Sequence, residues 1–216
     1  MDGQRGMLGH QQGGGVLTKP AHRQQGMTLV EIAIGLVIVG LLLMLGLPSF
    51  GQWLQNSQIR TAAESIQNGL QFAKAEAVRR NATVRFQLAD TATAACNLST
   101  TGTNWVVSQD DPTGACNAAA SDTVAPRIVQ MRPAAEGTAN AAIAAGQSTI
   151  VFNGMGRVTP VPAATVTIGI SNPTGGACAA LGGGGGPMRC LNVTVSTGGQ
   201  VRMCDPALAS TDPRGC

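Results

Sequence analysis

The sequence predicts an α+β protein, in which one long N-terminal α-helix packs on an antiparallel β-sheet or sandwich domain that contains disulfides. Three observations predict this fold class. The chain carries no charged residue from Ile32 to Ile59, helical periodicity continues beyond that run, and short alternating runs accompany all six cysteines in the remainder. We therefore divide the 216 residues into a leader (1–26), a membrane-spanning half of the helix (27–54), an amphipathic half (55–81) and a β-rich globular domain (82–216).

The charge balance excludes a general polyanion-binding protein. Formal net charge is +3, from 14 basic and 11 acidic residues. Three of the basic residues and one of the acidic residues precede position 27, which leaves 11 basic and 10 acidic residues in the rest of the chain. Any nucleic-acid binding would therefore have to be local.

The apolar run has the length of a membrane span. As a helix, the stretch from Ile32 to Phe50 covers about 28 Å, which matches the hydrocarbon thickness of a bilayer. The positive-inside tendency places the basic leader in the cytoplasm and the rest outside. A secretory signal peptide would have a shorter apolar stretch. A plain anchor would leave Glu31 unexplained, because an unpaired carboxylate at that depth costs a few kcal/mol.

The segment Gly26–Glu31, with the sequence GMTLVE, resembles the start of type IV pilins. The resemblance implies that prepilin peptidase cuts between Gly26 and Met27 and methylates the new amine of Met27. It also implies that Glu31 faces the N-terminal ammonium of a neighbouring subunit, where charge pairing offsets the burial cost and sets the register. In related pilins a proline at the place of Pro48 marks a segment that melts on assembly, and we expect a kink or local opening there.

The second half of the helix carries one small and apolar face. Its members recur at three- and four-residue steps: Ile59, Ala62, Ala63, Ile66, Leu70, Ala73 and Ala77. We expect this stripe to be core, in a helix from about Thr28 to Arg80 with Asn81 as its stop. The stretch Leu70–Leu88, LQFAKAEAVRRNATVRFQL, resembles the GspH/FimT group of minor pilins and pseudopilins. We interpret its charged residues as a solvated helix end rather than a ligand site.

Seven short runs predict strands, most of them alternating as half-buried antiparallel strands do. They are Thr83–Leu88, Trp105–Ser108, Arg127–Met131, Thr149–Phe152, Thr165–Ile170, Leu191–Ser196 and Gln200–Met203. Residues 133–147 and most of 91–123 are rich in Ala, Thr, Gly and Asn, and we expect loops there. The segment Ser148–Pro160 resembles a strand–turn–strand of the GspH/FimT group, with Phe152 in the core and Arg157 exposed.

The six cysteines predict disulfides rather than a metal site or a catalytic site. No C-x-x-C pair occurs, and both histidines, His10 and His22, precede Gly26, so a zinc site and a Ser–His–Asp set have no support. We expect neither an enzyme nor a cofactor. Adjacent Asp110 and Asp111 are interpreted as solvated acids rather than a calcium site. Six cysteines allow fifteen pairings, of which we favour the near-neighbour set, worth roughly 3 kcal/mol for each bridge: Cys96–Cys116, Cys178–Cys190 and Cys204–Cys216.

The segment Cys190–Pro206, CLNVTVSTGGQVRMCDP, predicts a hairpin that turns at Thr197–Gly199. It resembles the C-terminal motif G-R-x-R-x-C of FimT-like pilins, which implies DNA binding during uptake. Gly199, Arg202 and Cys204 match this motif, but Gln200 replaces its first Arg and removes one phosphate contact.

Arg202, Arg189 and Arg214 together would form a local basic patch, which nearby Asp205 and Asp212 weaken. No aromatic residue interleaves with them in the sequence, so base stacking has no support. The other interpretation, that Arg202 is an ordinary exposed cation on a strand, stays open.

These features predict a minor type IV pilin of the GspH/FimT group that acts as a structural subunit in pilus assembly. It would be a single-pass protein of the inner membrane, with its C-terminal domain in the periplasm, before incorporation into a filament. Its partners would be other pilins or pseudopilins, prepilin peptidase and, if the basic hairpin is functional, double-stranded DNA. A pseudopilin of type II secretion and a solitary membrane-anchored binding protein remain the alternatives.

Overall fold

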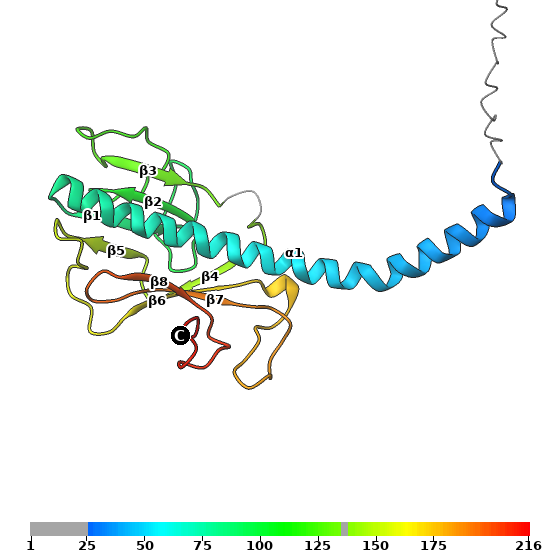
Figure 1. Cartoon of the computed structure of the whole chain (residues 1–216). Coiled ribbons are helices and arrows are strands. Elements are labelled where there is room, and N and C mark those ends of the chain that lie inside the picture. The colour runs from blue at the N-terminus through cyan, green and yellow to red at the C-terminus, as the bar shows by residue number, and fades with distance from the viewer. Residues whose placement is uncertain (1–25, 135–137) are drawn as a thin grey trace, which may run out of the picture. The chain divides into compact units, whose positions relative to one another are not determined.

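The computed structural model describes residues 26–134 and 138–216, except for the side chains of residues 45–49. The chain divides into two compact units, Met1–Leu43 and Met44–Cys216. The helix α1 spans Leu29–Arg80 and contributes to both units (Figure 1). The predicted leader lies outside the described residues, apart from Gly26.

A threonine cap begins α1. The Oγ1 atom of Thr28 accepts a hydrogen bond from the backbone amide of Glu31 at 3.2 Å, and the carbonyl of Thr28 accepts one from the amide of Ile32 at 3.2 Å. A threonine followed three residues later by glutamate is the signature of a capping box. The same carboxylate also favours the positive end of the helix dipole.

The large apolar side chains described in the first unit are not buried within that unit. Leu29 is 84% exposed, and the other large apolar residues described between Met27 and Leu43 are exposed as well. No helix among the described residues is both long enough and apolar enough to cross a membrane. The helix α1 continues through position 48 without interruption. The kink or melting of this segment on assembly, which the resemblance implies, stays a prediction.

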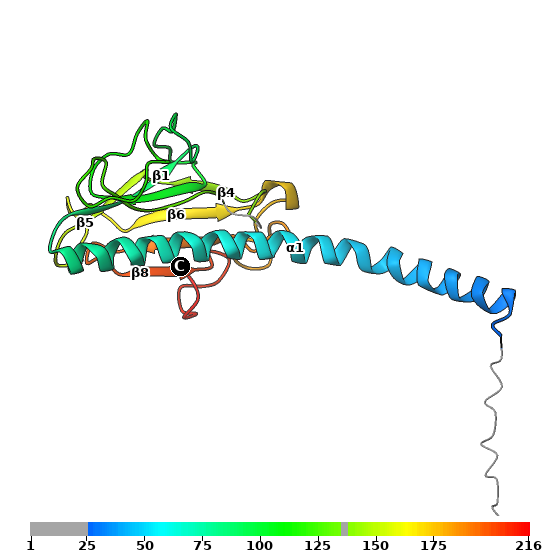
Figure 2. The ribbon, with the colours of Figure 1, turned by 90° about the horizontal axis from the view of Figure 1, so that it is seen from above.

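The second unit contains two four-stranded sheets, and every strand pairing in them is antiparallel. The first sheet has the order β3-β2-β1-β5 and the second the order β4-β6-β7-β8. The strands are β1 (Val84–Ala89), β2 (Asn104–Ser108), β3 (Ile128–Arg132), β4 (Ala142–Ala145), β5 (Thr149–Phe152), β6 (Val166–Ser171), β7 (Leu191–Val195) and β8 (Val201–Cys204); a short 3-10 helix η1 covers Pro173–Gly175. Within this unit the helix runs along both sheets, as Figures 1 and 2 show.

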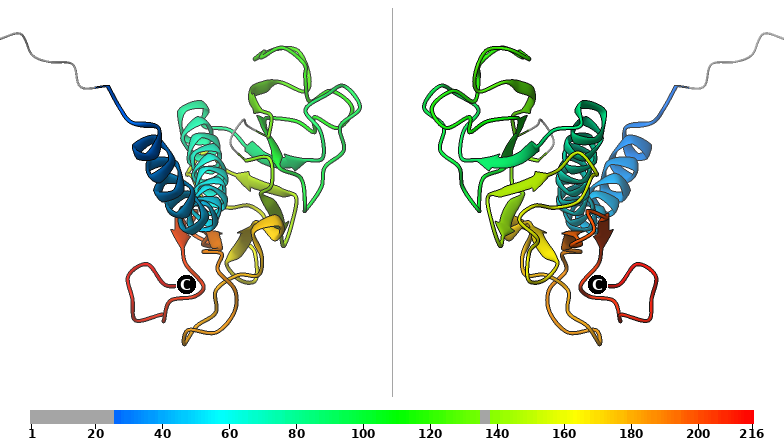
Figure 3. Two further views of the ribbon diagram at one scale, coloured as in Figure 1. Left: turned by 90° about the vertical axis from the view of Figure 1, so that its right-hand side faces the viewer. Right: turned by 90° about the vertical axis from the view of Figure 1, so that its left-hand side faces the viewer.

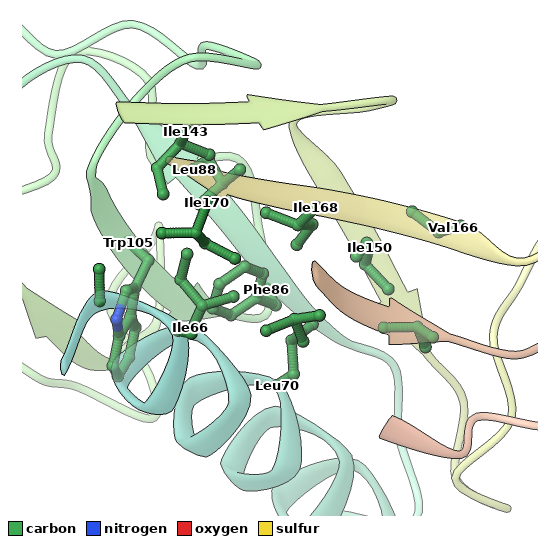
Figure 4. Close-up of a cluster of buried hydrophobic side chains, with 14 of the residues drawn as sticks. Ile66, Leu70, Phe86, Leu88, Trp105, Ile143, Ile150, Val166, Ile168 and Ile170 are labelled. Atoms are coloured by element: carbon green, nitrogen blue, oxygen red, sulfur yellow. The ribbon is translucent and has the colours of Figure 1, made fainter. Parts of the chain in front are cut away.

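One core joins the helix to both sheets. The predicted stripe of α1, from Ile59 to Ala77, is buried, as expected. Figure 4 shows Ile66 and Leu70 of the helix pointing toward Phe86 of the first sheet and Ile168 of the second. The fold class is thus the predicted one: a long helix packed on antiparallel sheets.

The C-terminal end of α1 is closed by a left-handed residue. Asn81 has φ 47°, its amide bonds to the carbonyl of Val78, and the amide of Ala82 bonds to the carbonyl of Ala77. This pair of bonds is the Schellman motif, in which asparagine is the usual substitute for glycine. Asn81 is therefore the predicted helix stop, and the motif sends the chain directly into β1.

One strand was missed by the sequence analysis. Residues 133–147, which we expected to be loop, include β4 at Ala142–Ala145, which pairs with β6 from Ile168 to Ser171. Alanine has a low intrinsic preference for strands, so the segment gives no strand signal of its own. The sheet edge supplied by β6 provides the pairing that makes it a strand.

Three disulfides brace the second unit, and they form the near-neighbour set: Cys96–Cys116, Cys178–Cys190 and Cys204–Cys216. The first of these is fully buried in a small second core with Ala89, Val106 and Ile128. The last closes the C-terminal loop, which is drawn in red in Figure 3, back onto the end of β8.

Candidate functional site

The predicted processing and assembly residues lie at the start of α1. Gly26 and Met27 precede the helix, both exposed, and Glu31 is exposed in its first turn. Glu31 is the sole charged residue among the described residues from Gly26 to Ile59. Its backbone amide is used by the Thr28 cap, and its carboxylate makes no ion pair with any described residue. The chain therefore leaves this carboxylate available to a partner from outside.

The hairpin of β7 and β8 forms as the sequence predicts. Strand β7 pairs with β8 from Asn192 opposite Cys204 to Val195 opposite Val201, and Gly199 at the turn has φ 79°. A side chain at Gly199 would meet the carbonyl of Gly156 in the neighbouring turn. Glycine is thus required there both by the backbone conformation and by the close approach of the two turns.

The three predicted cations of the hairpin do not form one uncompensated patch. Arg189 binds Asp205 at 3.1 Å, and Arg214 binds Asp212 at 3.2 Å. Hydrogen bonds from Arg214 hold the pKa of Asp212 below its usual value, so this carboxylate stays ionised. Both predicted acids thus offset the cations beside them.

Arg202 differs from the other two cations. Its guanidinium donates a hydrogen bond to the carbonyl of Gly215 and pairs with no carboxylate in the described part of the chain. Of the three cations it alone carries a charge that no neighbouring side chain compensates.

A groove of about 590 Å³ lies beside this hairpin, within the second unit. It lies between the helix segment around Trp53–Arg60, the strands β7 and β8, and the C-terminal loop. Its lining residues are Trp53, Asn56, Ser57, Arg60, Arg189, Leu191, Met203, Cys204, Asp205, Leu208 and Arg214. Arg202 is not among them. Of the three predicted cations, Arg189 and Arg214 thus line the groove.

Polar side chains of α1 fix the wall of this groove. The Oδ1 atom of Asn56 accepts a hydrogen bond from the backbone amide of Arg189 at 2.7 Å. On the same segment of the helix, the side-chain oxygens of Gln55 and Gln58 accept hydrogen bonds from the buried side chain of Asn172. These bonds hold the segments that carry Arg189 and η1 against the helix.

Sequence reasoning missed Trp53 and Arg60 as neighbours of the hairpin. They stand more than 120 positions before Arg189, and no local pattern links them to it. No aromatic residue interleaves with these cations in the sequence, but Trp53 of the helix lines the same groove as Arg189 and Arg214. Helix packing, rather than chain spacing, brings it there.

The charged stretch at the end of α1 is an ion-pair network. Glu76 binds Arg79 at 2.7 Å and Arg80 at 2.8 Å, and Arg80 also binds Asp122 at 2.5 Å. Hydrogen bonds from Arg79 and Arg80 lower the pKa of Glu76. The network ties the loop at Asp122 to the helix end, which gives these residues a structural role in place of ligand binding.

The adjacent acids of the loop after β2 are also engaged. Asp110 binds Arg127 at 2.5 Å, and this pairing lowers the pKa of its carboxyl group. Asp111 accepts hydrogen bonds from the amide and hydroxyl of Thr113. Within the described residues no cluster of His, Cys, Asp or Glu has the arrangement of a metal site.

Comparisons with known proteins agree with these features. The family model described as type II transport protein GspH matches residues 62–199, and that of the prokaryotic N-terminal methylation motif matches residues 21–47. No curated protein sequence matches the chain.

Two solved structures are similar, both of the type IV minor pilin FimU from Pseudomonas aeruginosa in different crystal forms. They share 14% and 16% identity with this chain, cover 73% of it and 98% and 94% of the FimU chain, and have a TM-score of 0.43. The GspH match covers nearly two thirds of the chain, from the second half of α1 to the turn of the hairpin. The chain therefore belongs to the GspH family, and it is a minor pilin or pseudopilin.

Proposed function

We propose that this chain is a structural subunit of a type IV pilus, inserted in the inner membrane and then incorporated into a filament. One observation carries this proposal. The segment from Met27 to Leu43 exposes its apolar side chains, carries the single carboxylate Glu31, and lies within the matched methylation motif. An apolar helix with one unpaired acid is stable in a lipid or protein environment that supplies the missing cation.

The assembly step follows from this chemistry. Cleavage after Gly26 would create an ammonium group at Met27, four residues before Glu31. In a filament the ammonium of one subunit and the Glu31 carboxylate of the next would neutralise each other, and a mismatched register would leave both charges buried and unpaired. The subunit thus acts through assembly, and we assign no catalytic role to it.

The experiment is to follow processing of the full chain. The chain is expressed with and without prepilin peptidase, and the N-terminus is identified by mass spectrometry. We expect a mature chain that begins at Met27 and carries one added methyl group, and a block on cleavage in Gly26→Leu. A chain that keeps its first 26 residues in the presence of an active peptidase would contradict the proposal.

A pseudopilin of type II secretion is the second candidate, and the description of the matched family favours it. The two candidates share the processing step, so processing does not separate them. Co-purification does, because a pilus subunit should appear in sheared surface pili. A type II pseudopilin should co-purify with the other pseudopilins and remain absent from such pili.

DNA capture by the hairpin is a finer proposal, favoured by the uncompensated charge of Arg202. Affinity of the full chain for duplex DNA would be measured at several salt concentrations. We expect Arg202→Ala to weaken binding and to lower the salt slope by about one unit, because one phosphate contact is lost. Arg132→Ala, which removes an exposed arginine of β3 in the other sheet, is the matched control. Equal affinities for all three proteins would exclude Arg202 as a DNA contact.

A further inference from the structure

The groove beside the hairpin has the composition of a site for an amphiphilic anion. Trp53, Leu191, Met203 and Leu208 give it an apolar surface, and its volume of about 590 Å³ is typical of small-molecule sites. Three guanidinium groups, one carboxylate, Asn56, Ser57 and Cys204 complete the lining. A ligand that matches this groove would combine an apolar part with a negative charge.

The three arginines retain hydrogen-bonding capacity for such a ligand. The side chains of Arg60, Arg189 and Arg214 are 75%, 57% and 75% exposed, and each pairs with one carboxylate. A guanidinium has five N–H donors, and these ion pairs use one or two of them. The remaining donors suit the several oxygens of a phosphate group, which arginine binds in a bidentate manner.

The position of Trp53 indicates where such a ligand would come from. Trp53 follows Phe50, the last residue of the apolar run, by three positions, and the two exposed rings lie 5.8 Å apart. Tryptophan is enriched at the interface between a bilayer and water. Arg60 lies seven residues beyond Trp53 on the same helix, which is about two turns or roughly 10 Å, on the side away from the apolar run.

We propose that this groove binds an anionic phospholipid, with its phosphate among Arg60, Arg189 and Arg214 and its glycerol and first methylenes against Trp53. The inference rests on the proposed membrane insertion of the apolar run. Bound lipid would hold the second unit at the membrane surface in the pool of subunits that precedes assembly. Asp205, which binds Arg189, disfavours a second negative charge deeper in the groove and so favours a single phosphate.

The experiment uses the full chain in detergent micelles. It is titrated with phosphatidylglycerol, phosphatidylcholine and inorganic phosphate, and bound lipid is counted by native mass spectrometry. We expect phosphatidylglycerol to bind at least tenfold more tightly than phosphatidylcholine, with no displacement by millimolar phosphate. Equal affinity for the two lipids would overturn the proposal, and so would displacement by phosphate at the concentration of the lipid.

Two variants and a control locate the site. Arg189→Gln/Arg214→Gln and, separately, Arg60→Gln should each lower the affinity for phosphatidylglycerol, the double variant at least tenfold. Arg60 is exposed on the helix, so its replacement tests the site with little effect on folding. Arg157→Gln removes an exposed arginine that does not line the groove and should bind as the wild type does. Unchanged binding in the double variant, or an equal loss in Arg157→Gln, would reject the groove.

Failure of this inference is distinguishable from failure of the proposed function. A chain that is cleaved after Gly26 and enters filaments but does not bind phosphatidylglycerol would overturn the lipid site alone. A chain that binds the lipid through these arginines but is never cleaved after Gly26 would confirm the lipid site and contradict the proposed pilus function.

Discussion

Gly154 shows how a single residue lets two elements approach. A Cβ atom at this position would lie 2.6 Å from Oδ1 of Asn81 and 2.9 Å from its backbone carbon. Because Asn81 is fixed by the helix cap, the turn after β5 would have to move. We expect Gly154→Ala to lower the free energy of unfolding by about 1–3 kcal/mol and Tm by several degrees.

Thermal unfolding followed by circular dichroism checks this prediction. Gly146→Ala is the control, because its added methyl group would meet no atom within 4 Å. A Gly154→Ala protein as stable as the Gly146→Ala protein would show that the turn shifts without penalty.

Glu76 gives the fold a dependence on pH. Hydrogen bonds from Arg79 and Arg80 place its pKa in the folded chain below the usual value of 4.5. Ionised Glu76 therefore stabilises the fold at pH values above 4.5, and this stabilisation is lost as the pH falls through the lowered pKa. We expect Glu76→Gln to reduce the free energy of unfolding by about 1 kcal/mol at pH 7 and by progressively less below pH 4.5.

Urea unfolding at a series of pH values tests the role of Glu76. Glu64→Gln is the matched control on the same helix, since its pair with Arg60 is exposed and should contribute little. A difference between wild type and Glu76→Gln that stays constant from pH 7 to pH 3 would rule out the ion pair as its cause.

At the scale of elements, the sequence predicts what is periodic and misses what depends on neighbours. The stripe of α1 can be predicted because a helix repeats every 3.6 residues. The cap at Asn81 can be predicted because its signal is local. Strand β4 cannot be predicted in this way, since Ala142–Ala145 forms a strand by pairing with the edge of β6. The groove is missed for the same reason: Trp53 and Arg189 line it together although they are far apart in the sequence, and no spacing encodes this.

The disulfides lie in elements of unequal burial, so removing them should lower the free energy of unfolding by unequal amounts. The bridges Cys96–Cys116 and Cys204–Cys216 close loops of 20 and 12 residues, so loop entropy alone assigns each about 3 kcal/mol. The first bridge also fills the small second core, whereas Cys216 is exposed. We expect the Cys96→Ala/Cys116→Ala protein to lose more stability than the Cys204→Ala/Cys216→Ala protein, because it also acquires a cavity.

Denaturant unfolding of the two double variants, each with its remaining bridges oxidised, measures this difference. A larger loss on removing the C-terminal bridge would mean that the loop it closes contributes more to the fold than its exposure indicates.

For the whole molecule, folding and assembly should depend on different residues. The core lies in Met44–Cys216, whereas Glu31 lies in the other unit, exposed and without an ion pair to any described residue. We expect Glu31→Gln to leave the thermal unfolding of the chain and cleavage after Gly26 unchanged. Incorporation into filaments should fall at least tenfold, because the ammonium of the adjoining subunit would then be buried without a counter-charge.

Immunoblots of sheared filaments, normalised to the amount of processed chain in the membrane, provide the measurement. Glu64→Gln serves as the control, because it removes a carboxylate that already has a partner in its own chain. Normal incorporation of Glu31→Gln would show that the first turn of α1 is recognised without its charge, and the pairing of Glu31 with a neighbouring ammonium would have to be abandoned. A loss of incorporation in both variants would instead point to the net charge of the helix rather than to the position of one acid.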